Sequence, residues 1–200
     1  MKRIFNPNSP RHFMQFACFG LLAAAFLLPL AAGAETVSAN TLMSKLHWRS
    51  VGPYIGGRVV AVSGVADNPD LFYMGGVDSG VWKSTNYGTT WENISDGWPS
   101  SSDSIGALAV APSNPKVIYA GTGESDIRGD MISGDGVYKT TDGGKIWKYA
   151  GLKDTHTTMS LVVDPKHPDV VYAASMGHVF KSGPHRGVFK TTDGGKTWHR

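Results

Sequence analysis

One twelve-residue pattern occurs three times in this chain and constrains its fold more than any other feature. The copies read GVWKSTNYGTTW (80–91), GVYKTTDGGKIW (136–147) and GVFKTTDGGKTW (187–198). From residue 84 to 140 and from 140 to 191, the steps between copies are 56 and 51 residues. Self-similarity at such a period marks a repeat architecture, in which each unit buries its apolar face against its neighbours. The chain is therefore expected to fold as an array of similar units.

Each unit contains short segments that are typical of strands. The apolar runs that open the units predict buried inner strands; they span 58–65, 105–111 and 159–164. An X-Pro turn follows each run and is expected to end the strand, because proline cannot donate to a strand ladder. Second strands are predicted at 71–76, 117–122 and 170–175, and third strands at 80–84, 136–140 and 187–191.

A fourth strand is expected to begin at the tryptophan that closes each pattern. Four short antiparallel strands in about 50 residues make one blade of a β-propeller. The predicted fold class is therefore all-β, a β-propeller of four-stranded antiparallel blades. About three blades are present, at approximately 46–98, 99–152 and 153–200. Because propellers close with about 4–8 blades, the ring is predicted to be incomplete.

The repeated octapeptide inside the pattern is interpreted as structural. It falls between the third and fourth strands, where glycine supplies a tight turn and Asp or Asn accepts backbone N–H groups. The tryptophan offers a large apolar area to bury between sheets. A catalytic carboxylate is needed at one place, not in every unit. The predicted structural residues are Ser84, Asn86, Gly88, Trp91, Thr140, Asp142, Gly144, Trp147, Thr191, Asp193, Gly195 and Trp198.

These octapeptides match S/T-x-D-x-G-x-x-W, the Asp-box or BNR repeat, with Asn in place of Asp in the first copy. With WRSVGPYIGGR (48–58) and VIYAGTGE (117–124), the chain resembles secreted bacterial sortilin/Vps10-like propeller proteins, often labelled glycosyl hydrolases. The resemblance covers residues 46–200. Asp-box propellers also include sialidases, xyloglucanase-type glycoside hydrolases and photosystem assembly factors. The resemblance implies that the box lies on the propeller face away from the ligand site.

The first 34 residues read as a signal peptide cleaved after Ala34. They combine a basic start, an apolar run and the small-residue sequence Ala32-Gly33-Ala34. The alternative is an uncleaved membrane anchor, because residues 16–34 are long enough to span a bilayer. The protein is predicted to be secreted or periplasmic in a bacterium. Residues 35–45 are predicted to be a linker between the leader and the blades. Only an uncleaved leader would bring the chain into contact with a membrane.

Cleavage would leave 166 of the 200 residues, without the single cysteine, Cys18. The leader carries three of the 19 Lys and Arg residues and none of the 16 acidic residues, so the remainder has no net charge. Nothing in this balance indicates a nucleic acid partner. No cofactor is predicted. No metal site is predicted either, because the histidines lack ligand spacing and the acidic loop does not fit a calcium loop.

Loop length varies between the second and third strands, and we expect ligand-binding residues there. From the second-strand tyrosine to the third-strand glycine the steps are 7 residues (73 to 80), 17 (119 to 136) and 15 (172 to 187). In a propeller this loop opens on the face opposite the octapeptide, and loops on a rigid scaffold carry function. The predicted binding residues, from these loops and the blade connections, are Arg58, Asp78, Glu124, Arg128, His156 and His178.

Two function classes remain open. One is a secreted binding module that presents these loops to a protein, peptide or glycan. The alternative is a glycoside hydrolase acting on polysaccharide, inactive in so short a chain, which needs two carboxylates about 5–9.5 Å apart. Its weak catalytic candidates are Glu124, Asp126 and Asp154, with Trp98 and Phe180 as the obvious loop aromatics. For each charged loop residue, a solvated loop or a salt bridge is the simpler alternative.

The ring needs further blades to close. The chain is interpreted as a fragment of a longer protein, and the alternative is that several copies close a ring together. Residues 48–52 (WRSVG) resemble the strand that completes a last blade on ring closure.

Overall fold

The computed structural model describes residues 38, 43–44, 46 and 57–200. The chain divides into two units, 1–50 and 51–200, and the account below concerns the second. The predicted leader, its cleavage site and the predicted strand at 48–52 lie outside the described residues. Among the residues described, no helix is long and apolar enough to cross a membrane.

Three antiparallel sheets, called here the first, second and third blades, confirm the all-β prediction. The first blade contains β1 (Val59–Val65), β2 (Asn68–Gly76), β3 (Gly80–Ser84) and β4 (Glu92–Asn93). The second contains β5 (Ile105–Val110), β6 (Ile118–Thr122), β7 (Val137–Thr140) and β8 (Trp147–Tyr149). The third contains β9 (Thr158–Val163), β10 (Val171–Ser175) and β11 (Gly187–Thr191). A single bridge between Lys190 and His199 marks the place of its fourth strand.

The first X-Pro turn differs from the prediction. In the first blade the strands turn at residues 66–67, and Pro69 lies inside β2. The pairing steps from Gly64 opposite Phe72 to Val65 opposite Asn68, and this irregularity leaves Pro69 without a partner. Proline is tolerated there because no ladder bond is required of it. In the other two blades the first strand ends before the proline, as predicted.

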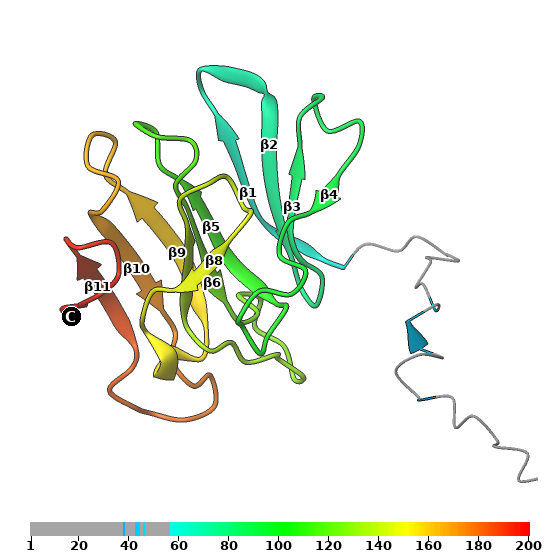
Figure 1. Cartoon of the computed structure of the whole chain (residues 1–200). Coiled ribbons are helices and arrows are strands. Elements are labelled where there is room, and N and C mark those ends of the chain that lie inside the picture. Colours follow the sequence, from blue (N-terminus) through cyan, green and yellow to red (C-terminus); the bar gives the residue numbers. More distant parts are fainter. Residues whose placement is uncertain (1–37, 39–42, 45, 47–56) are drawn as a thin grey trace, which may run out of the picture. The chain divides into compact units, whose positions relative to one another are not determined.

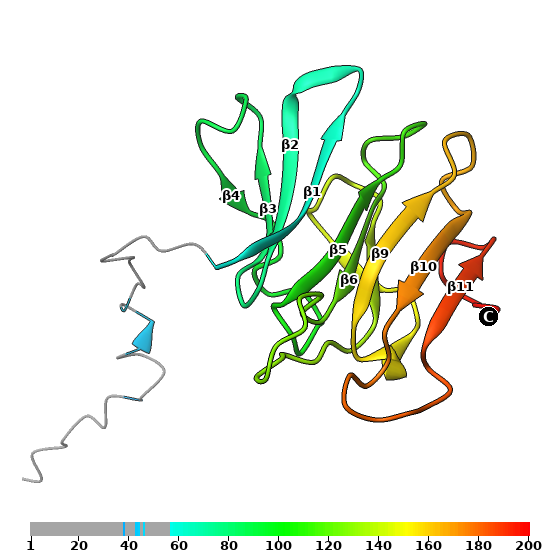
Figure 2. The same ribbon diagram turned by 180° about the vertical axis from the view of Figure 1, so that it is seen from behind.

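The three sheets pack face to face, with β1, β5 and β9 as neighbouring inner strands (Figures 1 and 2). Two apolar clusters fill the spaces between them. One joins the first and second blades through buried side chains such as Tyr73, Val81 and Ile118. The other joins the second and third blades through Tyr119, Val171 and others. Each blade is thus stabilised mainly by its neighbours, as expected for a repeat architecture.

The octapeptide forms the same hairpin in every blade. In the second blade the Thr140 hydroxyl donates to Asp142 Oδ1 at 2.7 Å and accepts the Gly144 amide at 3.1 Å. The same two bonds measure 2.8 and 3.0 Å in the third hairpin and 3.0 and 2.9 Å in the first; their residues are Thr191, Asp193, Gly195, Ser84, Asn86 and Gly88. The shared acidic or amide side chain therefore closes a turn.

The tryptophan of this hairpin binds the preceding blade. Trp147 Nε1 donates to the Ile94 carbonyl at 2.8 Å, and Trp198 Nε1 donates to the Ala150 carbonyl at 2.8 Å. Trp91, in the first hairpin, donates instead to a carbonyl of its own hairpin at 3.0 Å. The octapeptide therefore both closes a turn and fastens one blade to the one before it.

Two opposite edges of this unit have different roles. The octapeptide hairpins and the β1–β2, β5–β6 and β9–β10 turns lie at the upper edge in Figure 1. The β2–β3, β6–β7 and β10–β11 loops and the connections between blades lie at the lower edge. We call the lower edge the loop face.

Candidate functional site

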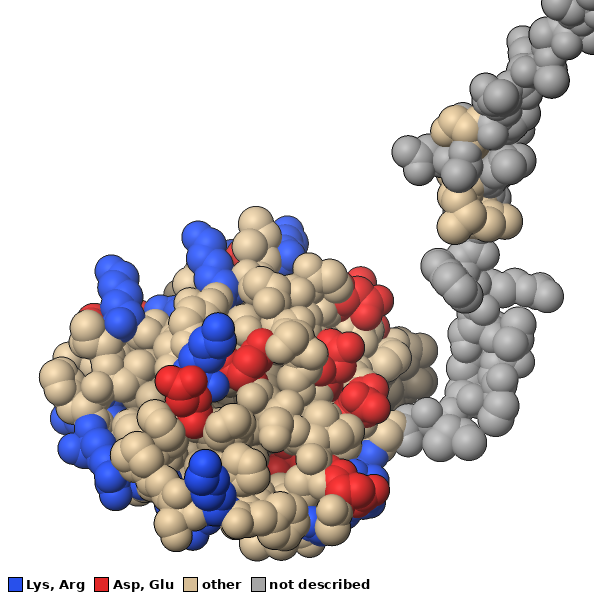
Figure 3. Space-filling model, turned by 90° about the horizontal axis from the view of Figure 1, so that it is seen from below, with Lys and Arg blue, Asp and Glu red and all other residues tan. Residues whose placement is uncertain are grey.

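The loop face carries the variable loops and most of the predicted binding residues. Figure 3 views this face from below. Lys and Arg gather toward the side of the third blade, whereas Asp and Glu gather toward the first. Two regions on this face hold five of the six predicted binding residues: an ion cluster around Glu124 in the β6–β7 loop, and a hollow beside the β10–β11 loop.

Glu124 follows β6 and is fully buried. Its Oε1 contacts Arg58 Nη2 in a close ion pair and lies 3.5 Å from Arg128 Nε. Its Oε2 accepts the Ile132 amide at 3.4 Å. A buried carboxylate requires such partners, and the loss of one partner is costly. Glu124 therefore joins the start of the first blade's inner strand to the β6–β7 loop, which is a structural role.

Arg128 has a second acidic neighbour in its own loop. Its Nη2 lies 2.5 Å from Asp130 Oδ1, and its Nε lies 3.0 Å from the same oxygen. The hydrogen bond from Arg128 lowers the pKa of Asp130. The charge of Arg128 is thus shared between two carboxylates of the loop.

Asp135 was not among the predicted site residues, yet it organises the same loop. It accepts bonds from the Ser100 hydroxyl at 2.7 Å and from the Ser101 amide and hydroxyl, each at 2.8 Å. Burial raises its pKa, but the bonds from Ser101 and Ser100 outweigh burial and the pKa is lowered. No local sequence signal connects Asp135 to a serine pair 34 residues away.

The remaining acidic candidates are exposed. Asp126 lies in the β6–β7 loop, and Asp154 lies in a short 3-10 helix, η1 (Lys153–Thr155). Neither forms an ion pair within residues 57–200. Asp78, with a left-handed φ of 59°, is also exposed, and its amide donates to the Ser104 hydroxyl at 3.0 Å.

Of the two loop aromatics named from the sequence, Trp98 is partly buried and packs against the apolar cluster between the first and second blades. Its ring centroid lies 5.0 Å from that of Tyr138 and 5.7 Å from that of Trp147, the latter edge to face. Its Nε1 donates to Asp103 Oδ1 at 3.1 Å. Phe180 is 68% exposed in the β10–β11 loop. Phe180 is therefore the more exposed of the two aromatic side chains.

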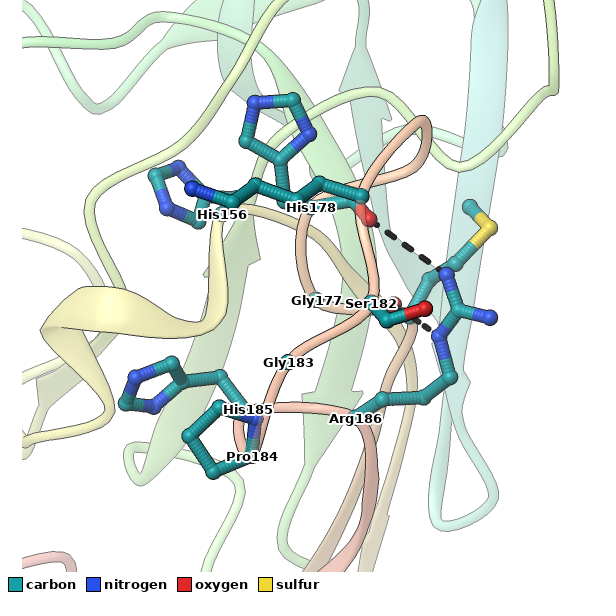
Figure 4. A pocket seen from close by; sticks show the side chains of 10 residues that line it. His156, Gly177, His178, Ser182, Gly183, Pro184, His185 and Arg186 are labelled. Carbon is teal, nitrogen blue, oxygen red and sulfur yellow. Dashed lines mark hydrogen bonds between the residues drawn. The ribbon is translucent and has the colours of Figure 1, made fainter.

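A hollow of about 250 Å³ lies beside the β10–β11 loop (Figure 4). Three histidines line it: His156 from the end of η1, and His178 and His185 from the loop. The rings of His156 and His178 meet edge to face, with centroids 5.4 Å apart. Lys181 also lines the hollow, and no acidic side chain does. The hollow thus offers hydrogen-bond donors and positive charge.

The backbone around the hollow is held in shape from both sides. Arg186 Nε donates to the Met176 carbonyl at 2.7 Å, and its Nη2 donates to the His178 carbonyl at 3.3 Å. Figure 4 shows Arg186 on the opposite side of the loop from His156 and His185. His156 has a left-handed φ of 56°, and its carbonyl accepts the Gly134 amide at 2.6 Å. A strained residue held in place by surrounding bonds is common at binding sites.

The hollow beside the β10–β11 loop contains residues that are distant in the sequence. His156 and His178 were predicted to bind, and they share one hollow. His185 and Lys181 were not among the predicted residues, although both lie in the second-longest of the three variable loops. In the described part of the chain, no group of three His, Cys, Asp or Glu residues is placed to hold a metal ion.

Known proteins with a similar sequence or structure are propellers. The xyloglucanase Xgh74A of Acetivibrio thermocellus is 23% identical over an alignment that covers 66% of this chain and 24% of that protein. An ancestral GH74 enzyme superposes with a TM-score of 0.59 at 24% identity, covering 77% of this chain and 19% of that one. The GH74 xyloglucanase of Xanthomonas campestris gives 0.56 at 20% identity, covering 77% and 22%.

Another structural neighbour is YCF48 bound to D1 peptide, with a TM-score of 0.51 at 13% identity, covering 77% of this chain and 44% of that one. The present chain spans about a quarter of the length of the curated relative that it matches. The family model described as sortilin, neurotensin receptor 3, matches residues 79–200, which is more than half of the chain. With its repeated blades and octapeptide hairpins, this chain belongs to the Sortilin-Vps10 family.

Proposed function

We propose that this chain is a binding module that takes up an acidic group of a peptide or glycan in the hollow beside the β10–β11 loop. The observation that carries the proposal is the lining of that hollow. Histidines from two separate segments and Lys181 surround it without a neighbouring carboxylate. Carboxylate, phosphate and sulfate oxygens accept charge-assisted hydrogen bonds from such donors.

The position of the hollow supports the same role. It lies on the face opposite the octapeptide hairpins, among loops of unequal length carried by a constant scaffold. Binding residues favour such loops. Among proteins of similar fold, one was solved with a bound peptide and others are xyloglucanases. A peptide or a glycan is therefore the class of ligand that we propose.

Binding can be measured by titrating the purified chain with polyglutamate, with polygalacturonate and with neutral xyloglucan. We expect an acidic polymer to bind and Lys181→Ala with His178→Ala to weaken that binding at least about 10-fold, because two donors are lost. Lys148→Ala, which removes an exposed lysine of β8, is the matched control and should bind as before. Equal binding by the double variant, or preference for the neutral polymer, would contradict the proposal.

A glycoside hydrolase is the second candidate, and the curated relative favours it because that protein is named a xyloglucanase. The burial of Glu124 in an ion cluster leaves Asp126 and Asp154 as the exposed carboxylates of the predicted trio. Incubation with xyloglucan and assay of new reducing ends tests this candidate. Release that disappears in both Asp126→Asn and Asp154→Asn supports it, and no release from the folded chain shows that this chain alone does not hydrolyse xyloglucan.

We also propose that the chain is exported and cleaved after Ala34. Expression with its own leader in a bacterial host, followed by mass spectrometry of the exported protein, provides the test. A chain beginning at Glu35 is expected. Retention of the leader in the membrane fraction would support the anchor instead.

A further inference from the structure

Two hollows lie between neighbouring blades at the edge that carries the octapeptide hairpins, which we call the hairpin face. The first hollow, of about 640 Å³, lies between the first and second blades, and the second, of about 400 Å³, lies between the second and third blades. Each is lined by the third-strand lysine of one blade and by the X-Pro turn and octapeptide hairpin of the next. Because the same parts of the repeat form both hollows, they differ mainly in their side chains.

In the second hollow, charges and hydrogen bonds are satisfied within the protein. Lys139 Nζ pairs with Asp169 Oδ1 at 2.6 Å and lies 5.2 Å from the centroid of the Tyr119 ring. The Tyr119 hydroxyl donates to the Pro168 carbonyl at 2.9 Å. Three lysines and three aspartates line this hollow in all, so its lining has no net charge.

In the first hollow, Lys116 has the position that Asp169 has in the second. The Lys116 carbonyl accepts the Gly143 amide at 3.0 Å, and the Asp169 carbonyl accepts the Gly194 amide at the same distance. Both residues directly follow the proline of their X-Pro turn. The third-strand lysine of the first hollow is Lys83. Two lysines therefore stand where the second hollow has an ion pair.

The positive charge of the first hollow is largely uncompensated. Lys83, Lys116 and Lys145 line it with a single carboxylate, that of Asp142. Asp142 Oδ1 already accepts the Thr140 hydroxyl at 2.7 Å and two amides of its own hairpin. Within residues 57–200, none of the three lysines forms an ion pair. An anion between them would offset the repulsion of like charges in this partly enclosed space.

Tyr73 adds a donor that lacks a partner. It lines the first hollow and is 2% exposed. Its hydroxyl forms no hydrogen bond in the described part of the chain, unlike that of Tyr119 at the equivalent position of the next blade. Burial raises the pKa of Tyr73, so the hydroxyl keeps its proton. Because an unpaired buried hydroxyl is costly, an acceptor oxygen placed in the hollow would be stabilising.

We propose that the first hollow binds a phosphate or sulfate group. Lys83, Lys116 and Lys145 supply ammonium groups, which are common ligands of such anions. The Tyr73 hydroxyl supplies a neutral donor, and the oxygens of a tetrahedral anion can accept from several donors at once. This site lies on the face opposite the hollow beside the β10–β11 loop, so it stands independently of the function proposed above.

Amide NMR of the isotopically labelled chain, titrated with inorganic phosphate at low salt, tests the site. The amides of Gly143 and Lys145 should shift and saturate, whereas the amide of His178 reports separately on the loop-face hollow. Low salt is needed because ions screen exposed charges. A second titration with glucose 6-phosphate distinguishes a free ion from a group carried on a larger molecule. Equal or tighter binding of the sugar phosphate would indicate a carried group.

Variants of the lining give the sharpest comparison. Lys116→Asp places a carboxylate beside Lys83, as in the second hollow, and should weaken phosphate binding at least about 10-fold. Lys145→Ala should also weaken it. Lys196→Ala is the matched control, because Lys196 holds the same hairpin position but lines the second hollow. Tyr73→Phe should weaken binding without lowering the thermal midpoint, a result that a purely structural role of the hydroxyl would not give.

The same spectra show whether each variant is folded, and Lys145→Ala, which changes an exposed side chain, decides the matter if another change unfolds the chain. The absence of a saturable shift at Gly143 would overturn the proposal. So would unchanged affinity in folded Lys116→Asp, Lys145→Ala or Tyr73→Phe, or an equal loss of affinity in Lys196→Ala.

Discussion

The first octapeptide hairpin and the two that follow it have the same internal bonds but different neighbours. In each, a hydroxyl binds the turn carboxylate or amide and accepts a glycine amide. The second and third hairpins also fasten their tryptophan to the preceding blade, whereas Trp91 bonds within its own hairpin. The comparison separates what the octapeptide does locally, which is to close a turn, from what it does between blades.

Truncating the tryptophan gives the largest expected difference between the hairpins. Trp147 is 6% exposed between two blades, so Trp147→Ala should cost about 3–5 kcal/mol of unfolding free energy. Trp91 is half-buried against its own hairpin, and Trp91→Ala should cost much less. Urea unfolding of both variants measures the difference. Equal losses would show that the tryptophan acts within the hairpin and not between blades.

The second-largest expected difference in stability comes from adding a methyl group at the glycine that ends the octapeptide turn. A Cβ on Gly195 would lie 2.6 Å from the Ala150 carbonyl oxygen of the preceding blade, and the same atom on Gly88 would meet only Trp91, at 3.4 Å. Both glycines have a left-handed φ, so each substitution carries a strain of about 1–2 kcal/mol. Gly195→Ala should lose about 1–3 kcal/mol more than Gly88→Ala, because it also overpacks an interface. Thermal unfolding of the pair checks this, and matching midpoints would contradict it.

Lowering the pH should destabilise the second and third hairpins, whose turns contain Asp142 and Asp193. It should not destabilise the first hairpin, which has Asn86 at the same position. The hydroxyl of Thr140 and the amide of Ile146 lower the pKa of Asp142 from its ordinary 3.8, and the hydroxyl and amide of Thr197 lower that of Asp193. A lowered pKa means stability that is present above about pH 4 and is lost as the pH falls through the folded-state value.

The variant that tests this copies the first hairpin. Asp142→Asn with Asp193→Asn should flatten the fall in stability between about pH 4 and 2, while changing the neutral-pH value less. Urea midpoints at pH 7 and pH 3 supply the comparison. If the double variant lost as much stability in acid as the parent, protonation of Asp142 and Asp193 would not be the cause of the acid sensitivity.

The smallest expected effect concerns the residue before the turn glycine. Tyr87 has a φ of 58°, at a position that Gly143 and Gly194 hold in the other hairpins. Tyr87→Gly removes backbone strain, but glycine loses about 0.5–1 kcal/mol more chain entropy on folding. The net change should lie within about 0.5 kcal/mol, whereas Gly143→Tyr should destabilise clearly. A large loss in Tyr87→Gly would show that the tyrosine side chain itself stabilises the first hairpin.

The sequence predicted the blades because their signals are local and repeated. Inner strands and the octapeptide turns lie within a residue or so of the predicted positions. The fourth strand begins at Trp147 in the second blade, as predicted, but at Glu92 in the first blade, and the third blade has only the Lys190–His199 bridge. The exception at Pro69 arises from a pairing irregularity in the first hairpin, which depends on the partner strand and not on the proline alone.

The sequence indicated which face of the propeller carries the candidate site, but it did not indicate which residues contact one another there. Unequal loop lengths indicated where ligand residues gather, and His156 and His178 do share a hollow. The same reasoning left Glu124 among catalytic candidates and Trp98 among ligand aromatics. The structure buries the first in an ion cluster and packs the second, partly buried, against an apolar cluster. Both outcomes depend on residues tens of positions away, Arg58 and Tyr138 among them.

By itself, the sequence determined the repeat, the strand order within each blade and the turn that the octapeptide closes, because those depend on residues close together in the chain. The tertiary structure decided which copies of an identical residue are covered. Tyr119 is buried and Tyr172 is exposed although strand register makes them equivalent. Burial is a property of the neighbouring blade, and a repeated sequence does not state where the last neighbour lies.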